Sequence, residues 1–240
     1  MPQPQQQDRV TLLANALVDT HVSVVWNAAR DLARLGSLAT AALPALETTL
    51  KSHDPTSRLW ARFAIVKITG DLEPHLDVFL KALGDKKVVF PGMASAAIAG
   101  LGASASRAVP LLIEELKESN PEYRWSAAGA LANIGPAAQA ASGMLIQTLN
   151  DPDEKVRWYS AWALGMIGVR EGIRPLIDAL DDIDDDVRAY AIRSIGMLGG
   201  QEALAALPKL ENLLEDDNPN IGALAQEAIG RIVVADGAAQ

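Results

Sequence analysis

Cysteine is absent from the 240-residue chain, which excludes disulfide bonds, thiolate metal sites and a cysteine nucleophile. Histidine is scarce, and His21, His53 and His75 lack the spacing of a metal-binding pair. Aromatic residues make up only 5% of the chain. We therefore expect no catalytic residue, no metal site and no cofactor.

Basic charge and long apolar runs are also lacking. The 21 basic and 30 acidic residues give a net charge of −9. Because Lys and Arg supply most of the affinity for phosphates, no nucleic-acid partner is expected. No run of 18 apolar residues occurs, so no membrane partner or membrane-spanning segment is predicted. The first residues do not form a signal peptide, and a cytoplasmic location is the default expectation.

The sequence does contain one motif of 13 residues, here called the phrase, that recurs about seven times. The clearest copies are residues 156–168, VRWYSAWALGMIG, and residues 187–199, VRAYAIRSIGMLG. A fixed period of this length is typical of stacked repeats. The closing glycines recur every 31–34 residues, at Gly36, Gly70, Gly102, Gly135, Gly168 and Gly199.

The period divides the chain into one repeat domain over residues 9–235. We expect a disordered leader at residues 1–8 and a short tail at residues 236–240. The repeats are assigned to residues 9–36, 37–70, 71–102, 103–135, 136–168, 169–199 and 200–234.

Each phrase has the pattern of an α-helix. If its first residue is position 1, then positions 1, 5, 8, 9 and 12 are apolar or small in nearly every copy, which traces one stripe of a helix. Shorter segments with a proline near their start, such as residues 43–50 and 109–116, predict a preceding helix in each repeat. In the third repeat Pro91 and Gly92 fall at positions 2 and 3, so its second helix should begin near Gly92.

This pattern resembles the HEAT-like repeats of the phycocyanobilin-lyase type over residues 9–234. The resemblance implies an all-α fold, an α-solenoid or alpha-alpha superhelix of about seven HEAT-like helix pairs. It implies a protein-binding scaffold in most cases and an enzyme occasionally. The matching residues are Asp153, Val156, Arg157, Ala161, Ala163, Leu164, Gly165, Ile167 and Gly168.

Position 2 is arginine in four copies, Arg58, Arg124, Arg157 and Arg188. We expect an Arg–Asp ladder in which each guanidinium bonds to the acidic helix cap of an adjacent repeat. Asp153 and Asp184 are examples of such caps. The alternative is that these arginines bind an anionic ligand.

All five tryptophans lie on second helices, which the resemblance places on the concave surface. Trp, Tyr and Arg are the residue types that dominate binding energy at interfaces. We predict a partner-binding face there, although a tryptophan can also simply cover the gap between neighbouring helices. Its residues are Trp26, Arg30, Trp60, Trp125, Trp158, Tyr159, Trp162, Tyr190 and Arg193.

The main hypothesis is therefore a non-enzymatic scaffold whose partner is another protein or a peptide. One alternative is a bilin-lyase-like enzyme or chaperone, in which Arg30 or Arg193 would hold the propionates of a tetrapyrrole. Another is an accessory repeat domain of a larger enzyme. The sequence does not fix the oligomeric state.

Overall fold

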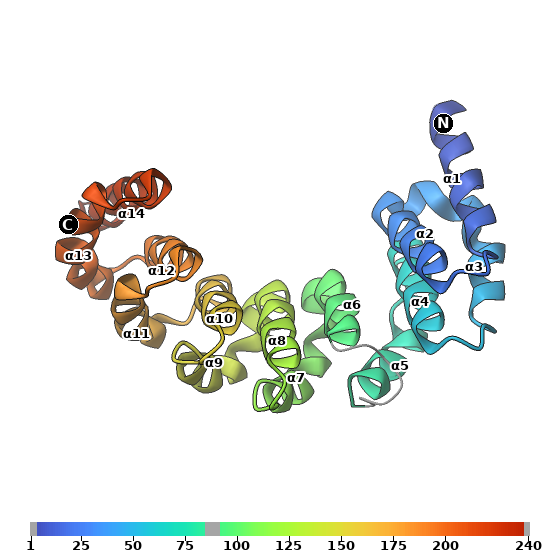
Figure 1. Cartoon of the computed structure of the whole chain (residues 1–240), viewed down its shortest axis with the longest axis horizontal. Helices are drawn as coiled ribbons and strands as arrows, with labels where there is room; N and C mark the ends of the chain where they lie inside the picture. Colours follow the sequence, from blue (N-terminus) through green and yellow to red (C-terminus); the bar gives the residue numbers. More distant parts are fainter. Residues whose placement is uncertain (1–3, 85–91, 238–240) are drawn as a thin grey trace. The chain divides into compact units, whose positions relative to one another are not determined.

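A computed structural model of the protein describes residues 4–84 and 92–237 (Figure 1). Within these ranges the regular structure is α-helical and 3₁₀-helical, without strands, which confirms the all-α solenoid fold. The chain divides into two compact units, Met1–Leu101 and Gly102–Gln240, here called unit 1 and unit 2. The sequence predicts one repeat domain instead.

Unit 1 contains the first three helix pairs. A 3₁₀ segment, Gly36–Ala42, precedes its third helix. The α-helices are α1 (Pro4–Ala16), α2 (Val22–Leu35), α3 (Leu43–Thr49), α4 (Pro55–Thr69), α5 (Glu73–Gly84) and α6 (Met93–Leu101). The start of α6 at Met93, directly after Gly92 with φ +75°, agrees with the expected late start.

The prediction of a disordered leader over residues 1–8 is wrong for residues 4–8, because α1 begins at Pro4. Proline is well tolerated at the first helical position, where its missing N–H has no partner to lose. Three glutamines, which are good helix formers, follow it. The helix then continues to Val10, whose burial holds α1 on the unit.

Unit 2 contains four helix pairs that form two layers (Figure 1). The first helices are α7 (Val109–Glu115), α9 (Ser142–Thr148), α11 (Ile173–Asp178) and α13 (Leu207–Asn212). The second helices are α8 (Pro121–Ile134), α10 (Glu154–Ile167), α12 (Asp185–Leu198) and α14 (Pro219–Gly237). In Figure 1 the second helices lie on the inner side of the curve of this unit.

Small residues let the second helices of unit 2 pack closely. Ala163 and Ser160 of α10 are fully buried. A Cβ atom on Gly165 would lie 2.5 Å from the hydroxyl oxygen of Ser194 on α12. That hydroxyl donates a hydrogen bond of 2.7 Å to the carbonyl oxygen of Ala161. The interface between repeats is thus the unit of stability, as in other repeat arrays.

One stretch, Met93–Glu115, is long and apolar enough to cross a membrane by length and composition alone. The structure does not fold it as one straight α-helix. It contains α6, the 3₁₀ segment Gly102–Ala108 and α7, with positive φ at Gly102 and a kink at Ala105. This is weak support for a membrane span, since buried helices of soluble proteins have the same composition.

Candidate functional site

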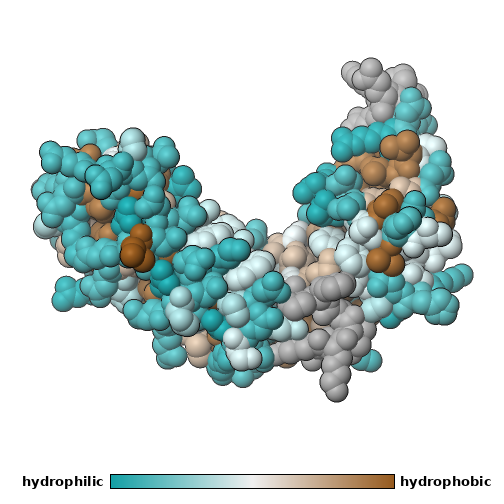
Figure 2. Space-filling view, viewed as in Figure 1, coloured by the Kyte–Doolittle hydropathy of each residue, from teal (hydrophilic) through white to brown (hydrophobic). Residues whose placement is uncertain are grey.

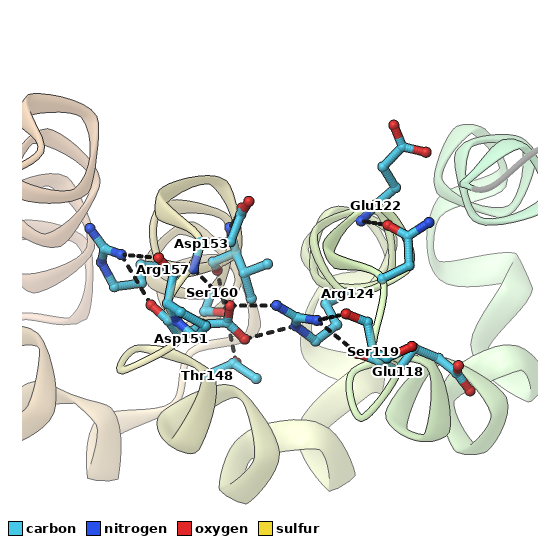
Figure 3. A network of polar contacts seen from close by, with 12 residues as sticks. Glu118, Ser119, Glu122, Arg124, Thr148, Asp151, Asp153, Arg157 and Ser160 are labelled. Carbon is cyan, nitrogen blue, oxygen red and sulfur yellow. Dashed lines mark hydrogen bonds and ion pairs between the residues drawn. The ribbon is translucent and has the colours of Figure 1, made fainter.

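Arginines at position 2 join consecutive repeats of unit 2 (Figure 3). Arg124 of α8 donates from Nε and Nη2 to the two carboxylate oxygens of Asp151 at 2.8 and 2.7 Å. Arg157 of α10 makes the same bidentate contact with Asp182 at 2.7 and 2.9 Å. All four side chains are at most 14% exposed. Charge-assisted bidentate pairs of this kind are stronger and more directional than neutral hydrogen bonds.

The expected partners of these arginines, the capping residues Asp153 and Asp184, are wrong. Each capping carboxylate accepts a hydrogen bond from its own helix, Asp153 from the N–H of Val156 at 3.1 Å and Asp184 from the N–H of Val187 at 3.0 Å. The arginine instead binds the aspartate two residues before the cap. The cap therefore starts the helix, and a separate carboxylate connects the repeats.

The Nη1 atom of each position-2 arginine donates hydrogen bonds to backbone carbonyl oxygens in the turn before its own helix. Arg58 donates from Nη1 to the carbonyl oxygens of Ser52 and His53 at 2.7 and 2.9 Å. Arg188 holds its own turn in the same way and reaches Asp216 of the next repeat at 3.2 Å. At Arg124, Arg157 and Arg188 these contacts engage the guanidinium within the protein and give no support to the anionic-ligand alternative.

The ladder shifts the titration of its members. Hydrogen bonding to Asp182 raises the pKa of Arg157. Burial acts to raise the pKa of Asp182, but hydrogen bonds from Arg157 and from the N–H of Asp184 outweigh it, and this pKa is lowered. Both groups are therefore held in their charged forms.

The first two repeats of unit 1 are joined differently. The indole N–H of Trp26 on α2 donates a 2.9 Å hydrogen bond to the carboxylate of Asp54, the cap of α4. Asp54 also accepts from the N–H and the hydroxyl of Ser57. Trp26, proposed as a partner-binding residue, thus has a role in joining these repeats.

Trp60 does not fit the predicted binding face, because it is only 9% exposed. Its ring meets that of Phe63 edge to face, with centroids 5.4 Å apart. Phe63 in turn lies where a Cβ atom on Gly100 of α6 would be, 2.4 Å from the Cζ atom of its ring. The missing side chain at Gly100 makes room for these rings, and Trp60 packs inside unit 1.

Arg30 also lies in unit 1, where its Nη2 donates to the amide oxygen of Asn27 at 2.8 Å. Its side chain is 45% exposed and carries a long contact of 4.0 Å to Asp31. Arg30 belongs to unit 1, whereas the stacked rings described next belong to unit 2.

In unit 2 four rings stack in one continuous row across α8, α10 and α12. Trp125, Tyr159, Trp158 and Tyr190 follow one another with centroids 5.6, 3.6 and 4.9 Å apart and interplanar angles of 16–23°. We call these four residues the aromatic row. Stacked aromatic pairs stabilise beyond the area they bury, so the row joins three repeats.

Trp162 lies beside the aromatic row and is not part of the stack. Its ring is tilted by 53° to both Tyr159 and Tyr190, with centroids 6.0 and 6.4 Å away. At the end of the row, the guanidinium carbon of Arg193 lies 5.7 Å from the centroid of Tyr190. All these rings are half-buried, and Arg193 is exposed.

The polar atoms of these rings have no partner in the part of the protein that the structure describes. The indole N–H groups of Trp125, Trp158 and Trp162 and the hydroxyls of Tyr159 and Tyr190 form no hydrogen bond with any residue in the described ranges. Burial raises the pKa of Tyr159, and the neighbouring Tyr190 adds to the rise, so its hydroxyl keeps its proton at neutral pH. The surface thus presents a series of unused donors.

A groove continues from the aromatic row between α12 and α14, and we call it the terminal groove. It consists of a polar hollow of about 410 Å³ and a more apolar hollow of about 330 Å³. Arg193, Leu224 and Glu227 line both hollows. Tyr190 lines the polar hollow, which places the last ring of the row at the mouth of the groove.

The sequence did not point to two features of this site. The ring of Tyr159 lies on Gly129, where an added Cβ atom would be 3.0 Å from the ring. A glycine in the middle of a helix pattern was the available signal. The groove residues Leu224 and Asp186 have no sequence signal, because the hollow exists only where α12 and α14 meet.

Within the described ranges, no three or more His, Asp or Glu side chains are grouped so that they could hold a metal ion. The surface combines aromatic rings, hydrogen-bond donors and a groove with both apolar and charged walls. Sites of this composition bind ligands by burial and hydrogen bonding.

Comparison with known proteins agrees with the repeat fold. A family model of HEAT repeats matches residues 143–230, which confirms HEAT-like repeats. This model is not specific for the phycocyanobilin-lyase type. No curated protein matches the chain.

The similar solved structures include engineered and designed proteins. Two engineered proteins of the Northeast Structural Genomics Consortium match with TM-scores of 0.60 and 0.62, each at 23% identity, covering 94% and 93% of this chain and 96% and 68% of theirs. A designed armadillo repeat protein in complex with the peptide (KR)4 has a TM-score of 0.58 at 20% identity, covering 93% of this chain and 99% of that protein. At these identities the likeness shows the fold alone.

Proposed function

We propose that this HEAT-like repeat protein is a non-enzymatic interaction scaffold and that unit 2 binds an extended segment of another protein or peptide. The segment would lie across the second helices α8, α10, α12 and α14. The observation that carries the proposal is the aromatic row with Trp162, whose five polar donors have no partner in the described ranges. A peptide backbone offers the carbonyl acceptors that such donors need.

The arrangement of the rings separates two roles within this surface. Trp158 lies between Tyr159 and Tyr190 at 3.6 and 4.9 Å, so both of its faces are used for stacking. No ring stacks in parallel on Trp162 among the described residues. We therefore assign the main binding contact to Trp162 and a supporting role to Trp158, since binding hot spots are rigid aromatic anchors with an accessible face.

The similar designed armadillo repeat protein holds the peptide (KR)4, which supports the idea that a scaffold of this fold can bind an extended peptide. Such binding needs no reactive group, and none of the proposed contacts involves one. The orientation of the partner would be set by the order of the rings along the row.

The test begins with a randomised 12-residue peptide library, displayed on phage and selected on the full chain. Enriched peptides are synthesised with a fluorescent label, and their dissociation constants are measured by anisotropy. Trp162→Ala should weaken binding by about 2 kcal/mol, roughly 30-fold, if Trp162 is the anchor. Trp26→Ala is the matched control, because it removes the same side chain from the repeat joint of unit 1 and, provided that unit 2 stays folded, should leave affinity unchanged.

Two results would contradict the proposal. One is a library that yields no peptide with measurable affinity for the folded chain. The other is a set of bound peptides whose affinity is the same for Trp162→Ala and for the parent protein. Circular dichroism of both variants keeps a loss of fold distinct from a loss of binding.

A further inference from the structure

We infer that the partner segment is basic, and that it places an Arg or Lys side chain in the polar hollow of the terminal groove and a neighbouring apolar side chain in the apolar hollow. This inference rests on the proposed function and names the chemistry of its ligand. It is carried by the charge of unit 2, the lining of the groove and the position of Arg193.

The charge of the chain is concentrated in unit 2. Residues 102–240 carry 21 acidic and 11 basic side chains, a net charge of −10, whereas residues 1–101 carry 9 acidic and 10 basic ones. Figure 2 shows a largely hydrophilic face over unit 2, with small hydrophobic patches. A field of one sign around a groove attracts ligands of the opposite sign and speeds their association.

The polar hollow concentrates this charge beside an aromatic ring. Asp185, Asp186 and Glu227 line it together with Tyr190 and Arg193. Asp185 is paired with Arg188 at 2.8 Å and Glu227 with Arg231 at 2.6 Å, so Asp186 is the carboxylate that a ligand could reach. Asp186 is exposed and has no hydrogen bond or ion pair within the described ranges. A guanidinium or ammonium group placed here would meet the carboxylate of Asp186, in a hollow that the ring of Tyr190 also lines.

The apolar hollow accepts a different side chain. Ile192 and Met197 of α12 face Leu224 and Ala228 of α14 across it. Its two charged residues at the α14 side, Glu227 and Arg231, neutralise each other through an ion pair of 2.6 Å. An aliphatic side chain such as Leu or Met is suited to this hollow, and methionine on its wall can adjust to the fit.

Arg193 lies between the two hollows and lines both of them. It rests on the ring of Tyr190 and forms no ion pair with a described residue. Because its guanidinium lies between the two side-chain pockets, it can donate a hydrogen bond to the backbone carbonyl between two adjacent peptide residues. We therefore expect the groove to bind a peptide in which a basic residue is next to an apolar one.

The peptides selected from the library on the full chain provide the test. We expect them to contain Arg or Lys beside Leu, Met or Ile. Each Arg is then replaced by citrulline, which keeps the shape of the side chain and removes its charge, and each Lys by Gln. Anisotropy should show at least a tenfold loss of affinity on this replacement at low salt, and a smaller loss at high salt.

Two protein variants locate the effect. Asp186→Lys should weaken binding of the basic peptides at least fivefold. Asp178→Lys makes the same charge change at an exposed site on α11, in the other helix layer, and should weaken it less than twofold. Thermal unfolding of both variants checks that the groove is intact.

The outcomes separate this inference from the proposed function. Neutral or acidic peptides that depend on Trp162 would leave the scaffold proposal standing and overturn the basic partner. Equal losses for Asp186→Lys and Asp178→Lys would overturn the groove as the location of the charge. A chain that selects no peptide at all would overturn both.

Discussion

The two units use the same helix pair but connect their repeats with different chemistry. In unit 2, Arg157 reaches Asp182, which stands two residues before the cap of the next repeat. At the first joint of unit 1, Val25 replaces the arginine, and Ser52 stands where unit 2 has aspartate. There the indole of Trp26 binds the cap instead. At this joint neither the arginine nor the aspartate of the ion pair is present, and the indole N–H of Trp26 joins the repeats instead.

The turn itself is the same in both units. The N–H of Asp184 donates to the carboxylate of Asp182 at 2.9 Å, and the N–H of Asp54 donates to the hydroxyl of Ser52 at 3.2 Å. The serine side chain therefore maintains the turn but cannot form an ion pair with an arginine. The comparison teaches that the aspartate has two separable jobs, one within its repeat and one between repeats.

The largest expected loss of stability comes from replacing Asp182 of unit 2 with serine, the residue that unit 1 has at this position. Asp182→Ser keeps an acceptor for the N–H of Asp184 but removes both carboxylate contacts to the largely buried Arg157. We expect the free energy of unfolding to fall by about 3 kcal/mol, because charged hydrogen bonds are lost and a guanidinium remains without its partner. Hydrogen exchange read by mass spectrometry should show the loss in α10 and α12.

Ser52→Asp is the reverse change and serves as the control. Since Val25 offers no guanidinium and the new carboxylate can still accept from the N–H of Asp54, we expect stability to change by less than about 0.5 kcal/mol. A loss in Asp182→Ser no larger than the change in Ser52→Asp would show that the ladder contributes little between repeats.

A second comparison concerns two helical glycines that accommodate rings. A Cβ atom on Gly100 in unit 1 would lie 2.4 Å from the ring of the buried Phe63, whereas one on Gly129 in unit 2 would lie 3.0 Å from the half-buried Tyr159. Alanine gains about 1 kcal/mol of helix propensity at either site. We expect Gly100→Ala to destabilise by about 1–2 kcal/mol, because overpacking outweighs this gain.

Gly129→Ala should be nearly neutral in stability, because Tyr159 can move by the few tenths of an ångström required. It should still disturb the aromatic row, which near-ultraviolet circular dichroism would detect. Chemical unfolding of both variants makes the measurement. Equal destabilisation at the two glycines would mean that the burial of the ring does not decide the cost.

The sequence predicted the helix pairs well, because the stripe of small and apolar residues is a local property of each helix. It also predicted that arginines join repeats, but not their partners. The capping oxygens of Asp153 and Asp184 are already occupied by helix N–H groups. The spacing of Asp151 and Asp182 two residues before these caps was the signal that could have identified the partners.

The binding face was harder to predict because it depends on neighbouring repeats. Trp60 and Tyr159 occupy the same position in their phrases, yet Trp60 is buried and Tyr159 is half-exposed. Trp60 meets Phe63, whose ring lies against Gly100 of the next repeat, whereas Tyr159 stacks on Trp125 of the preceding repeat. No pattern within one helix contains this information.

The smallest expected effect is a difference between the two units in how their stability depends on pH. All three histidines lie in unit 1, and burial lowers the pKa of His75, with the charge of Arg62 adding to the effect. The unfolded chain therefore takes up a proton near pH 6.5, whereas the folded protein does so only at lower pH. Unfolding is favoured by this difference, so unit 1 should lose a little stability as the pH falls below about 6.5.

Unit 2 has no histidine and should keep its stability through this range. Its lowered pKa at Asp182 protects the ladder until the pH falls below the ordinary aspartate value of 3.8, after which that contribution is lost as the carboxylate is protonated. Hydrogen exchange at pH 7.5 and 5.5, corrected for the intrinsic rate, should show a change in α4 and α5 but not in α10 and α12. His75→Gln should abolish the change in unit 1, and a change that persists in that variant would assign it to another group.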